Sequence, residues 1–188
     1  MSRLSPLSLE RLTEEQQSFW DAINRGPRAQ AGKVGLVGPF GVWARSPKIG
    51  TAVQALGAVA RYGTSLPDSV REVAICTVGA HYRAKFEFAA HAAFARDAGV
   101  EPAALDAIRR GREPAFTRVK DTLSYQVATE LLQQHRLGER TFQSARAALG
   151  ESLLIELVSV IGYYCLVSLT LNAFEVPVAE GMDDPFPG

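Results

Sequence analysis

The chain has 188 residues, 47% of them hydrophobic, which suits a single domain with a sizeable buried core. Lys plus Arg and Asp plus Glu number 20 each, so the basic excess typical of nucleic-acid binding is missing. The N-terminal sequence lacks the continuous apolar segment of a secretory signal, and the two cysteines have no CxxC or zinc spacing. We therefore expect a reduced, cytoplasmic protein without a nucleic-acid partner.

Short Gly and Pro segments divide the sequence into stretches with helical character. A capping box of Thr13 and Gln16 opens the first, and residues 28–45 are a glycine-rich stretch that we expect to form an ordered loop. The predicted helices span about residues 13–25, 46–62, 67–82, 84–98, 102–110, 115–136, 141–148 and 151–174. Since no strand-like alternation or repeat interrupts them, the predicted fold is all-α with a single domain.

The last predicted helix contains residues 157–174, a charge-free segment long enough to cross a membrane. Because the segment also carries hydroxyl and amide side chains, we expect neighbouring helices or a subunit interface to enclose it, and no membrane span. Gly138 is expected to end the helix 115–136. The tail that follows residue 177 is expected to be extended or mobile.

Three ionisable residues lie among apolar ones in REVAICTVGAHYRAKFEFAAHAAFARDAGV, residues 71–100. Glu87 and His91 are four residues apart and share one helix face, and Glu72 lies on the preceding antiparallel helix. In a favourable register, one imidazole and two carboxylates meet where burial and mutual charge separate their pKa values, as proton transfer requires. The alternatives are a solvated Glu–His pair, and a structural ion pair for Glu72.

Nearby cations and possible metal ligands leave further alternatives. Arg71, Arg83 and Lys85 can bind an anionic substrate or simply lie in water. Glu87 and His91 would need a third and fourth ligand to hold a metal, and none is suitably spaced, so no metal site is predicted.

Four other residues are given structural interpretations. His81 and His135 are expected at the surface. Cys76 has no neighbouring group that would lower the pKa of its thiol, so we expect an inert core residue. Glu156 is a second candidate for a buried carboxylate, with an interface salt bridge as the alternative.

The segment 71–100 resembles the core of the carboxymuconolactone decarboxylase and alkylhydroperoxidase-D-like superfamily. There the helix pair typically begins R-E-L/V-A-I and ends in a histidine helix closing with A-G-V/L. Also similar are GPFGVWARSP, SLPDSVREVAI, YQVATELL and ELVSVIGYYCLVSLTLNAF. The resemblance implies an alkylhydroperoxidase-D-like helical bundle over residues 36–177, with an N-terminal arm containing one helix (1–35) and a C-terminal tail (178–188).

The peroxidase branch of this superfamily uses a glutamate, a CxxC pair and a histidine as a thiol redox centre. On this chain the glutamate corresponds to Glu72 and the histidine to His91, whereas the two cysteine positions fall on Ala84 and Glu87. Because both thiols are missing there, we do not expect peroxide reduction by that route.

The decarboxylase branch is more similar, since it also lacks the cysteine pair and has a glutamate four residues before the histidine. It implies cofactor-free decarboxylation of a small carboxylated lactone such as 4-carboxymuconolactone. His91 would be the general acid, with Glu87 and Glu72 orienting it or relaying protons. The candidates for binding a substrate carboxylate are Arg45, Arg71 and Arg83. Dedicated decarboxylases usually lack an N-terminal arm as long as residues 1–45.

The resemblance also implies a homo-oligomer, commonly a trimer or hexamer. Phe40, Trp43 and the helix 151–174 are expected to form subunit contacts or a pocket wall that contacts the substrate. Two other functions stay open: another proton-transfer enzyme on the same site, such as a hydratase or isomerase, and a non-catalytic oligomeric binding protein.

Overall fold

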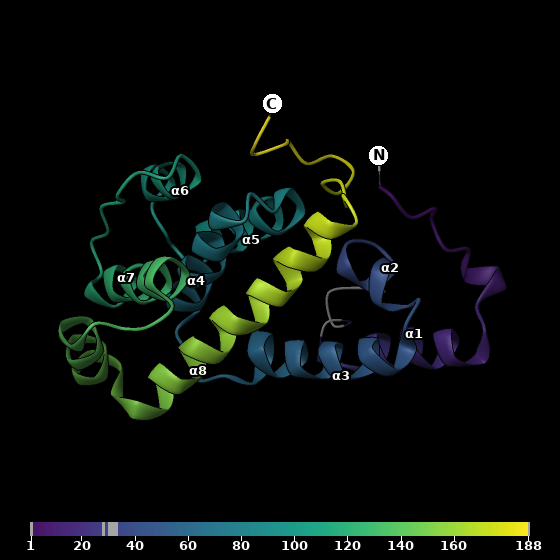
Figure 1. The fold of residues 1–188 in the computed structure, drawn as a ribbon, viewed down its shortest axis with the longest axis horizontal. Coiled ribbons are helices and arrows are strands. Elements are labelled where there is room, and N and C mark those ends of the chain that lie inside the picture. Colours follow the sequence, from purple (N-terminus) through teal and green to yellow (C-terminus); the bar gives the residue numbers. More distant parts are fainter. Residues whose placement is uncertain (1, 28, 30–33, 188) are drawn as a thin grey trace.

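A computed structural model describes residues 2–27, 29 and 34–187 of the chain. Within these ranges the regular structure is entirely helical, as predicted (Figure 1). A 3₁₀ turn at Leu9–Arg11 precedes the first α-helix, and a π-helix at Val59–Gly63 extends the third. The α-helices are α1 (Glu14–Arg25), α2 (Pro39–Trp43), α3 (Pro47–Ala58), α4 (Asp68–His81), α5 (Lys85–Asp97), α6 (Pro102–Arg109), α7 (Val119–Gln134) and α8 (Glu139–Ala173).

Local sequence signals set several helix boundaries. The Thr13 hydroxyl accepts from the Gln16 backbone N–H, and the Gln16 side chain accepts from the Thr13 backbone N–H, so the predicted capping box is present. Pro47 and Pro102 are the first residues of α3 and α6, where the missing N–H costs nothing. Gly99 follows α5 with a left-handed φ of 77°, which a glycine adopts without strain.

Three helix boundaries differ from the prediction. Helix α7 begins at Val119 rather than near residue 115. It ends at Gln134, and the next residue, His135, takes the left-handed conformation with φ 61°, whereas Gly138 is the N-cap of α8. The two helices predicted for 141–148 and 151–174 are joined as α8, and Gly150, with φ 82°, forms the non-helical break between them.

The predicted loop 28–45 falls partly outside the described residues, at 28 and 30–33. Its described part is ordered, and it contains the short helix α2. The Trp20 indole N–H donates to the Val34 carbonyl at 2.9 Å, and the rings of Phe40 and Trp43 meet edge-on with centroids 5.9 Å apart. These contacts fasten the segment to α1 and to the core.

Helix α4 is the centre of the bundle, because residues 69–79 are all buried. Helices α5, α7 and α8 pack around it, and α8 crosses the bundle diagonally in Figure 1. Among the described residues α8 is the one helix long and apolar enough to cross a membrane, and 44% of its most apolar window is buried against the rest of the chain. A core helix of a bundle has the same properties.

Both ends of the chain are attached to the bundle. Phe19 and Ile23 of α1 belong to the main hydrophobic cluster. The described part of the C-terminal tail has turns and bends but no regular secondary structure, and its Phe186 is buried against Phe88, with ring centroids 5.3 Å apart. An ion pair of 2.6 Å between Lys85 and an aspartate of the tail adds a second attachment.

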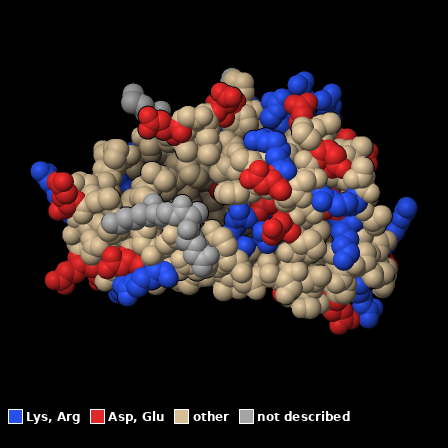
Figure 2. Space-filling view, turned by 180° about the vertical axis from the view of Figure 1, so that it is seen from behind, with Lys and Arg blue, Asp and Glu red and all other residues tan. Residues whose placement is uncertain are grey.

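Acidic and basic side chains are intermixed on the face shown in Figure 2, without a large region of one sign. They are densest on the right of this view, and the left carries fewer of them, mostly along its edge. This distribution agrees with the equal numbers of acidic and basic residues in the sequence.

Candidate functional site

The helix pair α4–α5 brings together the three ionisable residues singled out in the sequence. Glu72, Glu87 and His91 are only 1%, 4% and 7% exposed. Gly79 permits the close approach of the two helices, because a Cβ at this position would lie 3.3 Å from the backbone nitrogen of Phe88. A solvated Glu–His pair is therefore excluded.

The imidazole of His91 lies between the two carboxylates. Its Nδ1 is 2.6 Å from Oε2 of Glu72, and its Nε2 is 2.9 Å from Oε1 of Glu87. Both distances are those of charge-assisted hydrogen bonds. A doubly protonated imidazolium can donate to both carboxylates at once, whereas a neutral imidazole can donate to only one of them.

The surroundings favour the imidazolium. Burial alone would lower the pKa of His91, but the charge of Glu87 and the hydrogen bonds to Glu72 and Glu87 outweigh it and raise this pKa to about 9. Burial likewise opposes ionisation of Glu72. The hydrogen bond from His91, with the positive charges of His91, Arg61 and Arg71, nevertheless holds the pKa of Glu72 below its usual value. At neutral pH His91 is therefore an imidazolium and Glu72 is ionised.

Arg61 is a member of this site that the sequence interpretation missed. The π-helix that extends α3 carries it to Glu72, with which it forms a close ion pair. Its guanidinium carbon also lies 4.3 Å from the ring centroid of Phe94, in cation–π geometry. A π-turn is often found at functional sites, but its wider spacing cannot be read from a 3.6-residue periodicity. The available signal was an arginine inside the apolar sequence GAVARYG.

The charges around Glu72 form a connected network. Arg71 approaches Glu72 with an Nε–Oε1 distance of 3.4 Å and is also paired with the exposed Asp68. Each cation of the network, Arg61, Arg71 or protonated His91, has at least one carboxylate partner among Asp68, Glu72 and Glu87. Such pairing offsets the high cost of burying isolated charges.

A cavity of about 280 Å³ opens beside this network. Glu87, His91 and Arg61 contribute to its wall, whereas Glu72 lies behind the imidazole. The aromatic residues of the wall are Phe40, Tyr62, Phe86, Phe94, Tyr163 and Tyr164. The Tyr164 ring packs edge-on against the imidazole with centroids 5.0 Å apart, and burial raises the pKa of this phenol well above its usual value. The cavity therefore offers an acid–base pair to a small, largely apolar molecule.

Of the four predicted substrate-contacting residues, only Phe40 belongs to the described wall of the cavity. Arg83 is exposed and stacks over Phe186 of the tail, with its guanidinium carbon 5.3 Å from the ring centroid. Trp43 is buried in the main core, where its ring packs against Phe40. Arg71 is buried in the charge network and is missing from the described wall of the cavity.

Other residues considered in the sequence also lie outside the site. Arg45 lines a separate cavity next to the N-terminal arm. Glu156 is only partly buried and accepts a 2.8 Å hydrogen bond from the Ser65 backbone, so it is a structural acceptor. His81 and His135 are exposed, as predicted.

The thiols are unsuited to redox chemistry at this site. Cys76 and Cys165 are both free. Burial raises the pKa of the Cys76 thiol well above its usual value, and burial also raises the pKa of Cys165. A raised pKa reduces the thiolate fraction, and thiolate is the reactive form.

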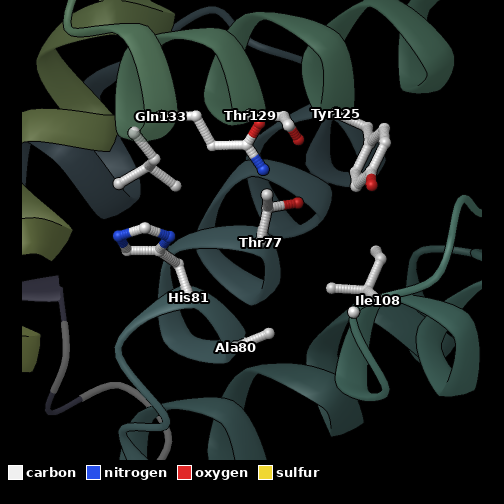
Figure 3. A pocket seen from close by; sticks show the side chains of 9 residues that line it. Thr77, Ala80, His81, Ile108, Tyr125, Thr129 and Gln133 are labelled. Atoms are coloured by element: carbon white, nitrogen blue, oxygen red, sulfur yellow. The ribbon is translucent and has the colours of Figure 1, made fainter.

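A second cavity of about 150 Å³ lies between α4 and α7 (Figure 3). Thr77, Tyr125, Thr129 and Gln133 project into it, and the Thr77 hydroxyl donates to the Val73 carbonyl at 2.7 Å. Its described lining lacks carboxylates and cations, apart from the exposed His81 at its margin. This cavity therefore has hydrogen-bonding groups but lacks the paired acid and base found at His91.

Among residues 2–27, 29 and 34–187, no group of three or more His, Cys, Asp or Glu side chains is arranged to hold a metal ion. The His91 nitrogens both face carboxylates, an arrangement of proton donors and acceptors.

Comparison with solved structures identifies the fold. A peroxidase-related protein from Ralstonia eutropha, described as an alkylhydroperoxidase AhpD core, superposes with a TM-score of 0.77 at 16% identity, covering 95% of this chain and 93% of its own. A peroxidase-related protein from a Silicibacter species gives 0.73 at 14% identity, covering 95% and 92% of the two chains. This chain has the alkylhydroperoxidase AhpD-like fold.

The AhpD-like fold also accommodates a more distant neighbour, the debrominase Bmp8, with a TM-score of 0.64 at 10% identity and coverage of 93% and 91%. Neither the family models nor the curated protein sequences gave a match to this chain. The resemblance first read from the segment 71–100 is thus confirmed at the level of the fold.

Proposed function

We propose that this AhpD-like chain is a cofactor-free acid–base enzyme, and specifically a decarboxylase of a small carboxylated lactone such as 4-carboxymuconolactone. The observation that carries the proposal is the His91 imidazolium, bonded to Glu72 and Glu87 at the wall of an aromatic cavity. A proton donor with a pKa of about 9 is charged at neutral pH and can deliver its proton to a carbanionic carbon.

In the proposed reaction, the bond between the ring carbon and the carboxylate breaks and carbon dioxide leaves. The electron pair moves through the adjacent double bond to the lactone carbonyl, and the carbon next to this carbonyl then takes a proton from the Glu87–His91 pair. A proton from water restores the pair. Glu72 lies behind the imidazole, where its negative charge holds the imidazole protonated and fixes its orientation, and Arg61 pairs with Glu72.

The aromatic wall supports the same reaction. A carboxylate loses hydration in an apolar cavity, and its charge disappears as carbon dioxide departs. The enolate-like intermediate gains negative charge at the carbonyl oxygen, which the imidazolium of His91 and the guanidinium of Arg61 can stabilise.

A second candidate, an isomerase or hydratase acting on a neutral carbonyl compound, is favoured by the pairing of the cations. The cations of the described cavity wall, Arg61 and His91, are already paired with carboxylates. A substrate without a carboxylate would leave these ion pairs undisturbed, and the Glu87–His91 pair could then move a proton between two of its carbons.

We do not propose a thiol peroxidase, although two structural neighbours are described as peroxidase-related. Cys76 and Cys165 have raised pKa values and are not part of the described wall of the cavity. A fold shared with proteins described in different terms does not fix the reaction.

The test is carbon dioxide release from 4-carboxymuconolactone by the purified protein. The proposal expects turnover by wild type, loss of at least about a hundredfold in His91→Gln and Glu87→Gln, and unchanged activity in His81→Gln, which replaces an exposed histidine. Absence of turnover by wild type would reject the decarboxylase. In that case, small lactones or enones that raise the melting temperature would support either the isomerase or a binding protein. Proton exchange into the bound compound would then indicate the isomerase, and its absence the binding protein.

We also propose that the chain forms a homo-oligomer and acts in the cytoplasm. The observation that favours an oligomer is a row of exposed apolar side chains on α8, which includes Ile155 at 67%, Leu166 at 41% and Leu169 at 55% exposure. Light scattering should give a mass several times that of one chain, and Ile155→Arg should lower it. A monomeric wild type would reject the oligomer.

A further inference from the structure

A third cavity, of about 300 Å³, is built mainly from segments outside the helix pair that carries His91. Its walls come from the N-terminal arm, the segment around α2 and the stretch that follows α8. Apolar side chains dominate the lining, among them Leu4, Leu7, Leu36, Val42 and Val176. An apolar cavity of this size suits a small hydrophobic chain.

Arg45 supplies a positive charge to this cavity. Its guanidinium donates to the carbonyls of Gly41 and Ser5. In the described part of the chain no carboxylate forms an ion pair with it, and Glu180, the one acidic residue of the described lining, is exposed. Two carbonyl oxygens satisfy part of the guanidinium donors but leave the charge uncompensated, which favours an incoming anion.

The wall formed by the arm is held in position. The Arg3 backbone N–H donates to the Phe174 carbonyl at 3.0 Å, and the Arg3 guanidinium pairs with Glu175 at 2.7 Å. Arg45 itself joins the arm to the segment around α2 through Ser5 and Gly41. The N-terminal arm is therefore a structural part of the cavity.

Phe86 belongs to the lining of this cavity and to that of the cavity beside His91. Its ring packs directly on Gly38, where a Cβ would lie 2.5 Å from the ring and where φ is 57°. A glycine at this position lets the ring stand close to the backbone as a partition between the two cavities.

We propose that the cavity next to Arg45 binds an unbranched apolar carboxylic acid, with the carboxylate on the guanidinium and the chain against the aliphatic wall. Since a water molecule takes about 30 Å³, the cavity has room for about ten non-hydrogen atoms. Octanoate has that size. The cavity beside His91 is less suited to this ligand, because its apolar wall consists mainly of aromatic rings, which fit a flat ring better than an unbranched chain.

Isothermal titration calorimetry with octanoate, octanol and octylamine tests the proposal on the full chain. Octanoate is expected to bind wild type saturably, with one molecule per chain and at least about tenfold more tightly than either other compound. Arg45→Gln should weaken octanoate at least about tenfold and leave octanol unchanged. Arg83→Gln, which removes an exposed cation elsewhere, should change neither.

A second variant keeps the proposal testable if Arg45→Gln does not fold. Leu4→Trp fills the cavity from the arm, outside the helical core, and should abolish binding of both octanoate and octanol. Octylamine binding as tightly as octanoate, no saturable binding, or octanoate affinity unchanged in both variants would each overturn the proposal. Because the readout is binding, the result is independent of turnover at His91.

Discussion

The raised pKa of His91 makes the stability of the fold depend on pH. In the folded chain this pKa is about 9, against 6.5 for an unperturbed histidine. The difference of about 2.5 units corresponds to roughly 3 kcal/mol of preferential stabilisation of the imidazolium form in the folded state. The imidazole is almost fully buried, so solvent screening does not reduce this value greatly.

The direction follows from proton binding. Below about pH 6.5 the histidine is protonated in both the folded and the unfolded chain, and the stabilisation is fully present. Between about 6.5 and 9 the folded chain keeps the proton while the unfolded chain releases it. The free energy of unfolding therefore falls as the pH rises through this window.

Urea unfolding at about pH 6 and about pH 8.5 measures the effect. We expect wild type to lose roughly 2–3 kcal/mol between these values, and His91→Gln to lose much less. The upper pH limit keeps the contribution of Cys76 to the pH dependence small. Because burial raises the pKa of this thiol in the folded chain, only the unfolded chain would release the thiol proton at higher pH, and this would lower the free energy of unfolding further. The lower pH limit avoids the titration of Glu72. The lowered pKa of Glu72 stabilises the folded chain at pH values above the usual pKa of a glutamate, and this contribution disappears only in acid.

A site-specific measurement separates His91 from the rest of the chain. The imidazole resonances of wild type should show one titration with a midpoint of about 9. Glu87→Gln removes the largest of the influences that raise this pKa, so the midpoint should fall, whereas Glu151→Gln on the exposed side of α8 should leave it unchanged. Equal pH dependence of stability in wild type and His91→Gln would refute the reasoning.

Three further predictions concern the tail, the partition and the thiols. Phe186→Ala should lower the free energy of unfolding in urea by about 3 kcal/mol and expose the tail to protease; a loss under about 1 kcal/mol would contradict its core position. Gly38→Ala should cost at least about 1 kcal/mol in thermal unfolding, because its Cβ meets the Phe86 ring at a left-handed φ, and unchanged stability would argue against that contact. A thiol reagent should modify Cys165 before the fully buried Cys76 in the native chain, and the reverse order would contradict the burial.

The sequence predicted the central part of the candidate site because its geometry is local. Glu87 and His91 are separated by one helical turn, and a short turn brings Glu72 onto the neighbouring helix. Their meeting required only that the two helices be antiparallel. The helical bundle could also be predicted from the sequence, because Gly and Pro mark most of its helix ends.

The remaining site residues depend on long-range packing. Arg61 reaches Glu72 through a π-turn, and helical periodicity alone would direct this side chain elsewhere. Phe40 and Trp43 look alike in an aperiodic segment, yet one lines the cavity and the other fills the core. Arg83 was a reasonable candidate because it is close to Glu87 in the sequence. It lies just after the end of α4, with a positive φ of 51°, where the chain turns away from the cavity.

The pairing of the buried charges constrains how the sequence can change. A single neutral replacement at Arg61, Glu72 or His91 leaves a partner's charge without its counter-charge in a region of low polarity. A library that varies one position at a time would therefore report a loss of stability at each of these positions. Simultaneous neutral replacement of two opposite members, such as Arg61 and Glu72, removes both charges and should cost less stability than the two single replacements added together.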